Sequence, residues 1–232
     1  MIRKPIDPDY PQMNRKPILA WLLSLVGGFT DAYTFLLFGN VFVAGQTGNV
    51  IFLTANLADH NWHESLLKLV IILTFSFGMI CSAIWTKWMD RSHYWRIYAL
   101  GLEFLVMITV GFLPMSVSAY FKLPLLAFAM AFQYSLYDQV ENVGYANVFT
   151  TANLKKATLN LAAGVLYQQP IVFKQAKIYF KVITCFILGA LFGSFLSHIF
   201  GERTIWFAAI LVLIAGLIHF HSIRKKELKY QW

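Results

Sequence analysis

Two polar stretches with the same order of residues lie inside an otherwise apolar chain. Residues 42–58 read FVAGQTGNVIFLTANLA, and a degraded copy returns at residues 146–162 as ANVFTTANLKKATLNLA. Self-similarity at a fixed offset indicates two related halves, in which Thr47 and Asn49 correspond to Thr151 and Asn153. Hydroxyl and primary amide groups both donate and accept hydrogen bonds. The two Thr-x-Asn pairs therefore predict a site for a small polar solute or an ion.

Further polar side chains inside apolar segments extend this candidate site. A carboxylate in a membrane span is costly, so Asp31 and Glu103 are expected to face protein or water. They are either structural hydrogen-bonding groups or gating and coupling groups of a substrate path. The alternative for the whole set is that the polar groups only hold helices together. The predicted substrate-binding residues are Asp31, Gln46, Thr47, Asn49, Asn56, Glu103, Gln133, Thr151, Asn153 and Asn160.

The elements that must position these groups are apolar helices. The chain has 232 residues, of which 58% are hydrophobic and only 13% charged, too little charge for a soluble exterior. Several runs are each long enough to cross a ~30 Å hydrocarbon core at 1.5 Å per residue. These runs are residues 18–38, 65–89, 95–113, 119–137, 177–200 and 204–219. The sequence predicts an all-α integral membrane protein whose main partner is the lipid bilayer, with no nucleic-acid partner.

The basic residues select a topology. If both Thr-x-Asn stretches also crossed, the segment with Asp59 and Glu64 would lie inside and the basic segment 87–96 outside, against the positive-inside bias. With about six spans and two broken or re-entrant polar segments, every basic cluster falls on the cytoplasmic side. Three spans per half make the second half enter from the opposite face, so the halves are expected to be inverted repeats. Whether segments 41–58 and 145–166 span or re-enter stays open.

The predicted organisation follows from these spans. It consists of a cytoplasmic tail (1–17), a first membrane repeat (18–114), a second membrane repeat (115–221) and a basic cytoplasmic tail (222–232). Pairs of small residues four positions apart, Gly78 with Ser82 and Gly189 with Gly193, predict close helix contacts. Both termini are expected in the cytoplasm.

Each polar stretch contains a predicted helix. In the first copy, a helix is expected from near Thr47 to Ala58, and its N-terminus would favour an anion or a carboxylate. The second copy carries Lys155 and Lys156 directly after its Thr-x-Asn pair. These lysines either line an aqueous vestibule or lie in water near the cytoplasmic surface.

Residues with metal, redox or catalytic chemistry form no recognisable constellation. His60 and His63 are spaced i, i+3, but no acidic or histidine partners complete a metal site. Cys81 and Cys185 both fall within predicted spans, which does not indicate a disulfide framework. There is no HExxH, no GxSxG and no phosphate-binding glycine loop followed by lysine. We therefore expect no enzyme activity, no metal and no cofactor.

The stretch GGFTDAYTFLLFGNVFVAGQTGNVIFLTANLA resembles the YoaK-like family of bacterial integral membrane proteins, catalogued as a domain of unknown function. In the second half the family tends towards Gln-Asn and Thr-Gly-Asn, where this chain has Gln133-Tyr134 and Thr151-Ala152-Asn153. The resemblance covers nearly the whole chain and implies a multi-pass bacterial membrane protein without an assigned activity. The family pattern of the first half is carried by Gly27, Gly28, Asp31, Ala32, Tyr33, Thr47, Gly48 and Asn49.

The leading hypothesis is a small-solute or ion transporter, or a channel, of the bacterial inner membrane. Its Thr-x-Asn segments would approach one another in the core of two inverted repeats. The alternative is a non-transporting membrane scaffold or regulatory subunit in which the polar repeats only join helices. Assembly into a homo-oligomer is left open.

Overall fold

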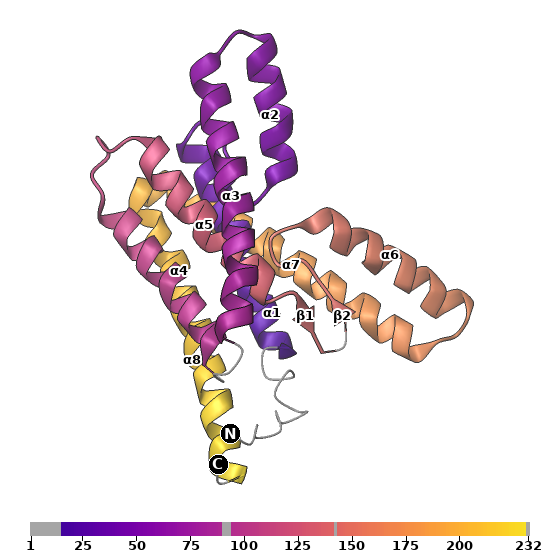
Figure 1. Cartoon of the computed structure of the whole chain (residues 1–232). Helices are drawn as coiled ribbons and strands as arrows, with labels where there is room; N and C mark the ends of the chain where they lie inside the picture. The colour runs from indigo at the N-terminus through magenta and orange to yellow at the C-terminus, as the bar shows by residue number, and fades with distance from the viewer. Residues whose placement is uncertain (1–14, 90–93, 142, 231–232) are drawn as a thin grey trace.

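The computed structural model describes residues 15–89, 94–141 and 143–230, so most of the predicted tail 1–17 and the last residues of the tail 222–232 lie outside the described residues. Within these ranges the chain forms eight α-helices, one 3₁₀-helix and one short β-ladder (Figure 1). They are α1 (Pro17–Leu37), α2 (Gln46–Ala58), α3 (Trp62–Met89), α4 (Trp95–Phe112), α5 (Ala119–Leu136), β1 (Gln139–Val140), β2 (Val143–Gly144), α6 (Thr150–Leu166), α7 (Pro170–Phe200), η2 (Gly201–Thr204) and α8 (Ile205–Tyr230).

The apolar runs form long helices. Apart from the two-residue strands, the described elements are helical, which confirms the all-α prediction. In the described residues, four helical stretches have the length and composition of membrane spans: Pro17–Leu37, Trp62–Met89, Trp95–Phe112 and Pro170–Lys225. The last of these contains α7, η2 and most of α8. Helix α5, with Lys122 and Pro124 in its interior, is not among the four.

The helices pack in a regular set of pairs. Helix α1 packs against α7 and α8, while α5 packs against α3 and α4. Helix α2 lies along α3, α6 lies along α7, and α4 lies along α8 (Figure 1). Helices α1 to α4 of the first half correspond to α5 to α8 of the second. Each contact of a helix has a counterpart: α1 with α7 corresponds to α5 with α3, α1 with α8 to α5 with α4, and α2 with α3 to α6 with α7. The two halves therefore make equivalent contacts.

Glycines permit the closest of these helix crossings. A Cβ atom on Gly189 of α7 would lie 2.0 Å from the Leu25 carbonyl oxygen of α1, so only glycine fits there. Gly28 of α1 meets the α7 backbone in the same way, and Gly193 meets Phe29. The prediction of close helix contacts at the small-residue pairs is confirmed.

Each polar stretch folds as a loop followed by a helix. Val41, Val43 and Ala44 precede α2 and are fully buried. Helix α2 covers Gln46–Ala58, which confirms the predicted helix in the first copy. It then forms a hairpin with the first part of α3, and α6 forms a corresponding hairpin with the first part of α7; the two hairpins extend in different directions (Figure 1).

A β-ladder precedes α6 and was not predicted. Strands β1 and β2 pair antiparallel, with Val140 opposite Val143. Each strand has two residues, too few for an alternating apolar pattern to be visible in the sequence. The ladder forms a short hairpin between the end of α5 and the second polar loop.

Candidate functional site

Asn49 fastens the loop that precedes α2. Its Oδ1 accepts a hydrogen bond from the backbone N–H of Phe42 at 3.0 Å, and its Nδ2 donates to the carbonyl of the same residue at 2.6 Å. Nδ2 also donates to Oε1 of Gln46 at 2.9 Å, and the Gln46 amide donates to the Val43 carbonyl at 3.1 Å. Asn49 is fully buried. Its amide thus satisfies the buried backbone N–H and carbonyl of Phe42, which have no helical or β-ladder partner in this loop.

Asn153 does the same in the second half. It accepts from the N–H of Ala146 at 3.0 Å and donates to the carbonyl of Ala146 at 2.6 Å. A further bond from Nδ2 reaches the Phe149 carbonyl at 2.9 Å. In both halves the asparagine binds both backbone groups of the residue seven positions earlier. We call this arrangement the asparagine clamp.

Asp31 of α1 holds the same loop from the other side. Its Oδ1 accepts a hydrogen bond from the backbone N–H of Ala44 at 2.8 Å, and only 4% of the residue is exposed. Gly45, the next residue, is the N-cap of α2. The position at this helix N-terminus that was predicted to favour an anion or a carboxylate therefore has Asp31 beside it.

The second half uses different residues at the corresponding place. Nε2 of Gln133 donates to the Leu23 carbonyl of α1 at 3.2 Å. Nδ2 of Asn147, in the second loop, donates to the carbonyls of Gln133 and Tyr137 at 3.1 and 3.0 Å, at the end of α5, where the Gln133 carbonyl also accepts the Tyr137 N–H. Among the described residues, Oε1 of Gln133 and Oδ1 of Asn147 are buried acceptors without a donor.

The two loops meet α1 on consecutive turns. Gly27 lies against Asn147 and Val148 of the second loop, and Asp31, four residues further on, binds Ala44 of the first. The polar loops thus come close together at α1, and the helices that follow them lead away from this point (Figure 1). Thr47 and Thr151, at the first turns of these helices, are exposed.

The remaining predicted residues lie apart from these loops. Glu103 of α4 is 1% exposed, and neither of its carboxylate oxygens has a hydrogen-bond partner among the described residues. Asn160 of α6 faces Gln175 of α7 at 3.5 Å. Lys155 and Lys156 are both exposed, and Nζ of Lys156 donates to the Gly144 carbonyl at 2.8 Å.

A polar cavity of about 250 Å³ opens between α2, α3 and the turn after α1. Lys68 at its base is 2% exposed; its Nζ donates to the Gly39 carbonyl at 3.0 Å and pairs with Glu64 one turn earlier. Asn56 belongs to the predicted set, whereas the charged pair was missed. An acid and a base four residues apart at the start of a long apolar run were the available signal. The cavity is lined by Gly39, Asn40, Phe52, Asn56, Asn61, Glu64 and Lys68.

A family model described as "Protein of unknown function (DUF1275)" matches residues 19–218. The chain belongs to this family. No curated protein and no solved structure matches it. Within this DUF1275 member, the matched region runs from the first turn of α1 into α8, so both asparagine clamps and the polar cavity lie inside the family domain.

Proposed function

We propose that this protein is a six-span membrane transporter or channel built from two inverted repeats. Helices α1, α3, α4, α5, α7 and α8 would cross the bilayer, and α2 and α6 would be re-entrant. Both termini would lie in the cytoplasm of a bacterial cell, as the distribution of basic residues predicts.

The direction of the helices supports the inverted arrangement. The Gly39 carbonyl at the end of α1 binds Lys68 near the start of α3, so α1 and α3 run in opposite directions. The hydroxyl of Tyr120 near the start of α5 binds the His63 carbonyl near the start of α3, and Gly78 further along α3 faces Ala131 of α5. Helix α5 therefore runs parallel to α3 and opposite to α1, its equivalent in the first half.

One observation carries the proposal. Each half buries a non-helical loop at an equivalent place, and the two loops reach consecutive turns of α1. Irregular backbone at membrane depth is tolerated only inside protein or beside a wet cavity, and inverted-repeat transporters place their sites at such breaks. A structural bundle would not need two of them side by side.

The polar cavity is the proposed entry site for the solute. Lys68 and Glu64 neutralise one another, and the side-chain amides of Asn40 and Asn56 face a shared space. A cavity without net charge that offers donors and acceptors suits a small polar solute such as a polyol or a zwitterion. An inorganic cation is disfavoured there because the Lys68 ammonium already occupies the position between two oxygen ligands.

The transport proposal is tested by the re-swelling of proteoliposomes after an osmotic upshift with glycerol, xylitol, glycine or alanine. We expect the wild-type protein to accelerate re-swelling for at least one of these solutes. Asn56→Leu replaces the amide that lines the cavity by an apolar group of similar size and should abolish the acceleration, while Ala55→Leu on the exposed side of the same helix should preserve it. Equal rates for Asn56→Leu and wild type would exclude the cavity as the entry site.

The proposed topology has its own test. After replacement of Cys81 and Cys185, single cysteines are placed at the exposed positions His60, Gln168 and Leu228. An impermeant maleimide added to intact cells should label only His60→Cys, and permeabilised cells should show all three labels. External labelling of Gln168→Cys would contradict the inverted arrangement.

A scaffold without transport activity is the second candidate, and the asparagine clamps favour it. In both clamps, the side-chain oxygen and nitrogen of the asparagine form hydrogen bonds with the chain's own backbone rather than with a ligand. In that case no solute would accelerate re-swelling, and loss of a clamp would reduce recovery of a membrane partner in proportion to loss of folded protein.

A further inference from the structure

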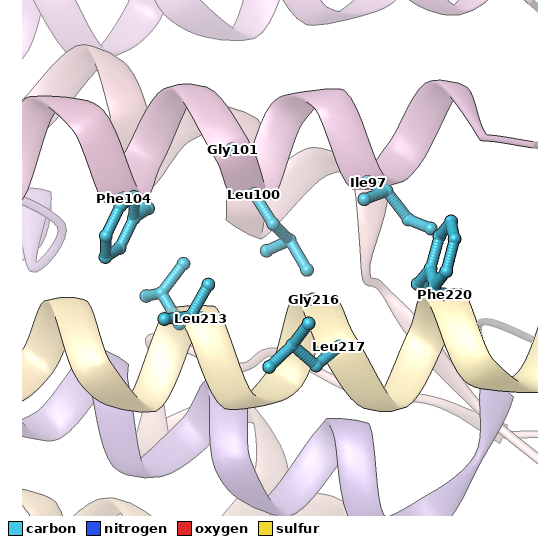
Figure 2. Close-up of a pocket in the computed structure, with 9 residues that line it drawn as sticks. Ile97, Leu100, Gly101, Phe104, Leu213, Gly216, Leu217 and Phe220 are labelled. Atoms are coloured by element: carbon cyan, nitrogen blue, oxygen red, sulfur yellow. The ribbon is translucent and has the colours of Figure 1, made fainter.

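An apolar groove separates α4 and α8 at the surface of the bundle. Figure 2 shows Gly101 of α4 and Gly216 of α8 facing this gap, with larger side chains on both sides of them. Among the described atoms, nothing lies within 4 Å of a Cβ built on either glycine. The groove has a volume of about 300 Å³, and it is lined by Ile97, Leu100, Gly101, Phe104, Val212, Leu213, Gly216, Leu217 and Phe220.

The groove fits within one leaflet of a bilayer. From Ile97 to Phe104 it follows α4 for seven residues, or roughly 10 Å at 1.5 Å per residue. One leaflet contributes about half of the ~30 Å hydrocarbon core. Both helices are candidate spans by length and composition, so this wholly apolar groove would face the hydrocarbon core. It accommodates a flexible hydrocarbon chain that lies along the helices.

The C-terminal end of α8 gives the groove a polar end. The ring of Tyr94 lies 5.7 Å from that of Phe220, and its hydroxyl donates to Glu227 at 2.6 Å. Burial and the bond to Glu227 raise the pKa of the Tyr94 phenol, and the neighbouring Arg224 opposes this in part, so the hydroxyl stays protonated at neutral pH. This tyrosine closes the groove at the level where aromatic residues meet lipid headgroups.

Basic residues surround this end. Arg224 lies one helical turn after Phe220, and it and Lys225 are exposed. From residue 222 onward the sequence has four basic residues, Arg224, Lys225, Lys226 and Lys229, against one acidic residue, Glu227. Glu227 is engaged with Tyr94. The exposed Arg224 and Lys225 therefore make this end of the groove positive, which complements an anionic headgroup.

We propose that the α4–α8 groove binds one anionic phospholipid of the leaflet on the side of the α8 C-terminus. One acyl chain lies between Gly101 and Gly216, and the phosphate contacts Arg224 and Lys225. This site is independent of the polar cavity and of any transport activity. A lipid held there fixes the spacing of α4 and α8.

The test is native mass spectrometry of the full-length protein in micelles containing equal amounts of phosphatidylglycerol and phosphatidylcholine. The wild-type protein should retain one phosphatidylglycerol in preference to phosphatidylcholine. Gly101→Leu with Gly216→Leu fills the groove and should lower retention by about tenfold or more. The matched control, Ala83→Leu with Ala162→Leu, introduces the same two side chains at exposed positions of α3 and α6 and should retain lipid normally.

A second variant keeps the proposal testable if the leucines disturb folding. Arg224→Gln leaves the groove intact and should reduce the preference for phosphatidylglycerol by about fivefold. Equal retention of the two lipids by the wild-type protein would overturn the proposal, as would unchanged retention in a folded double-leucine variant. A wild-type dimer that the leucines convert to monomers would also overturn it, because a second copy would then occupy the groove.

Discussion

Replacement of Asn153 by alanine separates a structural role of the polar repeats from a ligand-binding role. The substitution leaves the N–H and the carbonyl of Ala146 without their partner, in a residue that is only 9% exposed. Each buried unpaired group costs about 1–3 kcal/mol, and the higher helix propensity of alanine returns about 0.5 kcal/mol. We therefore expect Asn153→Ala to lower the free energy of unfolding by about 2–5 kcal/mol.

The assay is reversible unfolding in mixed detergent micelles, followed by circular dichroism. Thr151→Ala is the matched control, because this residue lies on the same helix, was predicted to bind the same ligand and is exposed. Its unfolding free energy should stay within about 0.5 kcal/mol of the wild-type value. If Asn153→Ala is as stable as this control, the asparagine clamp contributes no stability and our reasoning is refuted. Asn49→Ala should reproduce the loss in the first half.

Three further predictions concern other contacts. Gly189→Ala should destabilise the fold by about 3 kcal/mol or more, because its methyl group would overlap the Leu25 carbonyl. Gly216→Ala, where the space is open, should be neutral or stabilising by up to about 1 kcal/mol. Thermal unfolding of the two variants measures both effects. Lys122→Met removes the buried member of an ion pair whose other member, Glu202, is partly exposed, and should cost about 2–3 kcal/mol; addition of Glu202→Gln should recover part of this loss in a double-mutant cycle. Asp31→Asn keeps an acceptor for the Ala44 N–H and should cost about 1–2 kcal/mol, less than Asp31→Ala, and wild-type stability of Asp31→Asn would contradict a role for its charge at the α2 N-terminus.

Local patterns allowed much of the fold to be predicted. Apolar runs of membrane length became the long helices, and the polar stretch that starts near Thr47 became α2. Gly78 of α3 and the pair Gly189 and Gly193 of α7 lie at helix crossings, as small-residue spacing predicts. These features depend on properties of neighbouring residues, which a sequence displays directly.

The candidate site was predicted only in part. The sequence singled out Asn49 and Asn153, but their spacing is the same whether the amides face a solute or a loop backbone. The structure places Lys68 and Glu64 beside Asn56 in a cavity, and it places Asn147 at the end of α5. The i, i+4 spacing of Glu64 and Lys68 was the one signal for the charged pair, and no pattern distinguished Asn147, because an asparagine near a span end usually lies in water.

By itself the sequence determined that the chain is helical, that it has membrane-length apolar segments and that its polar repeat occurs twice. Only the tertiary structure decided where the polar groups are used. The partners of Asp31 and Gln133 lie on other segments, and the approach of both loops to α1 depends on Gly27 and on helices far apart in the chain. Such contacts depend on which faces pack together, and hydrophobic periodicity fixes a helix and its apolar face but not its neighbour.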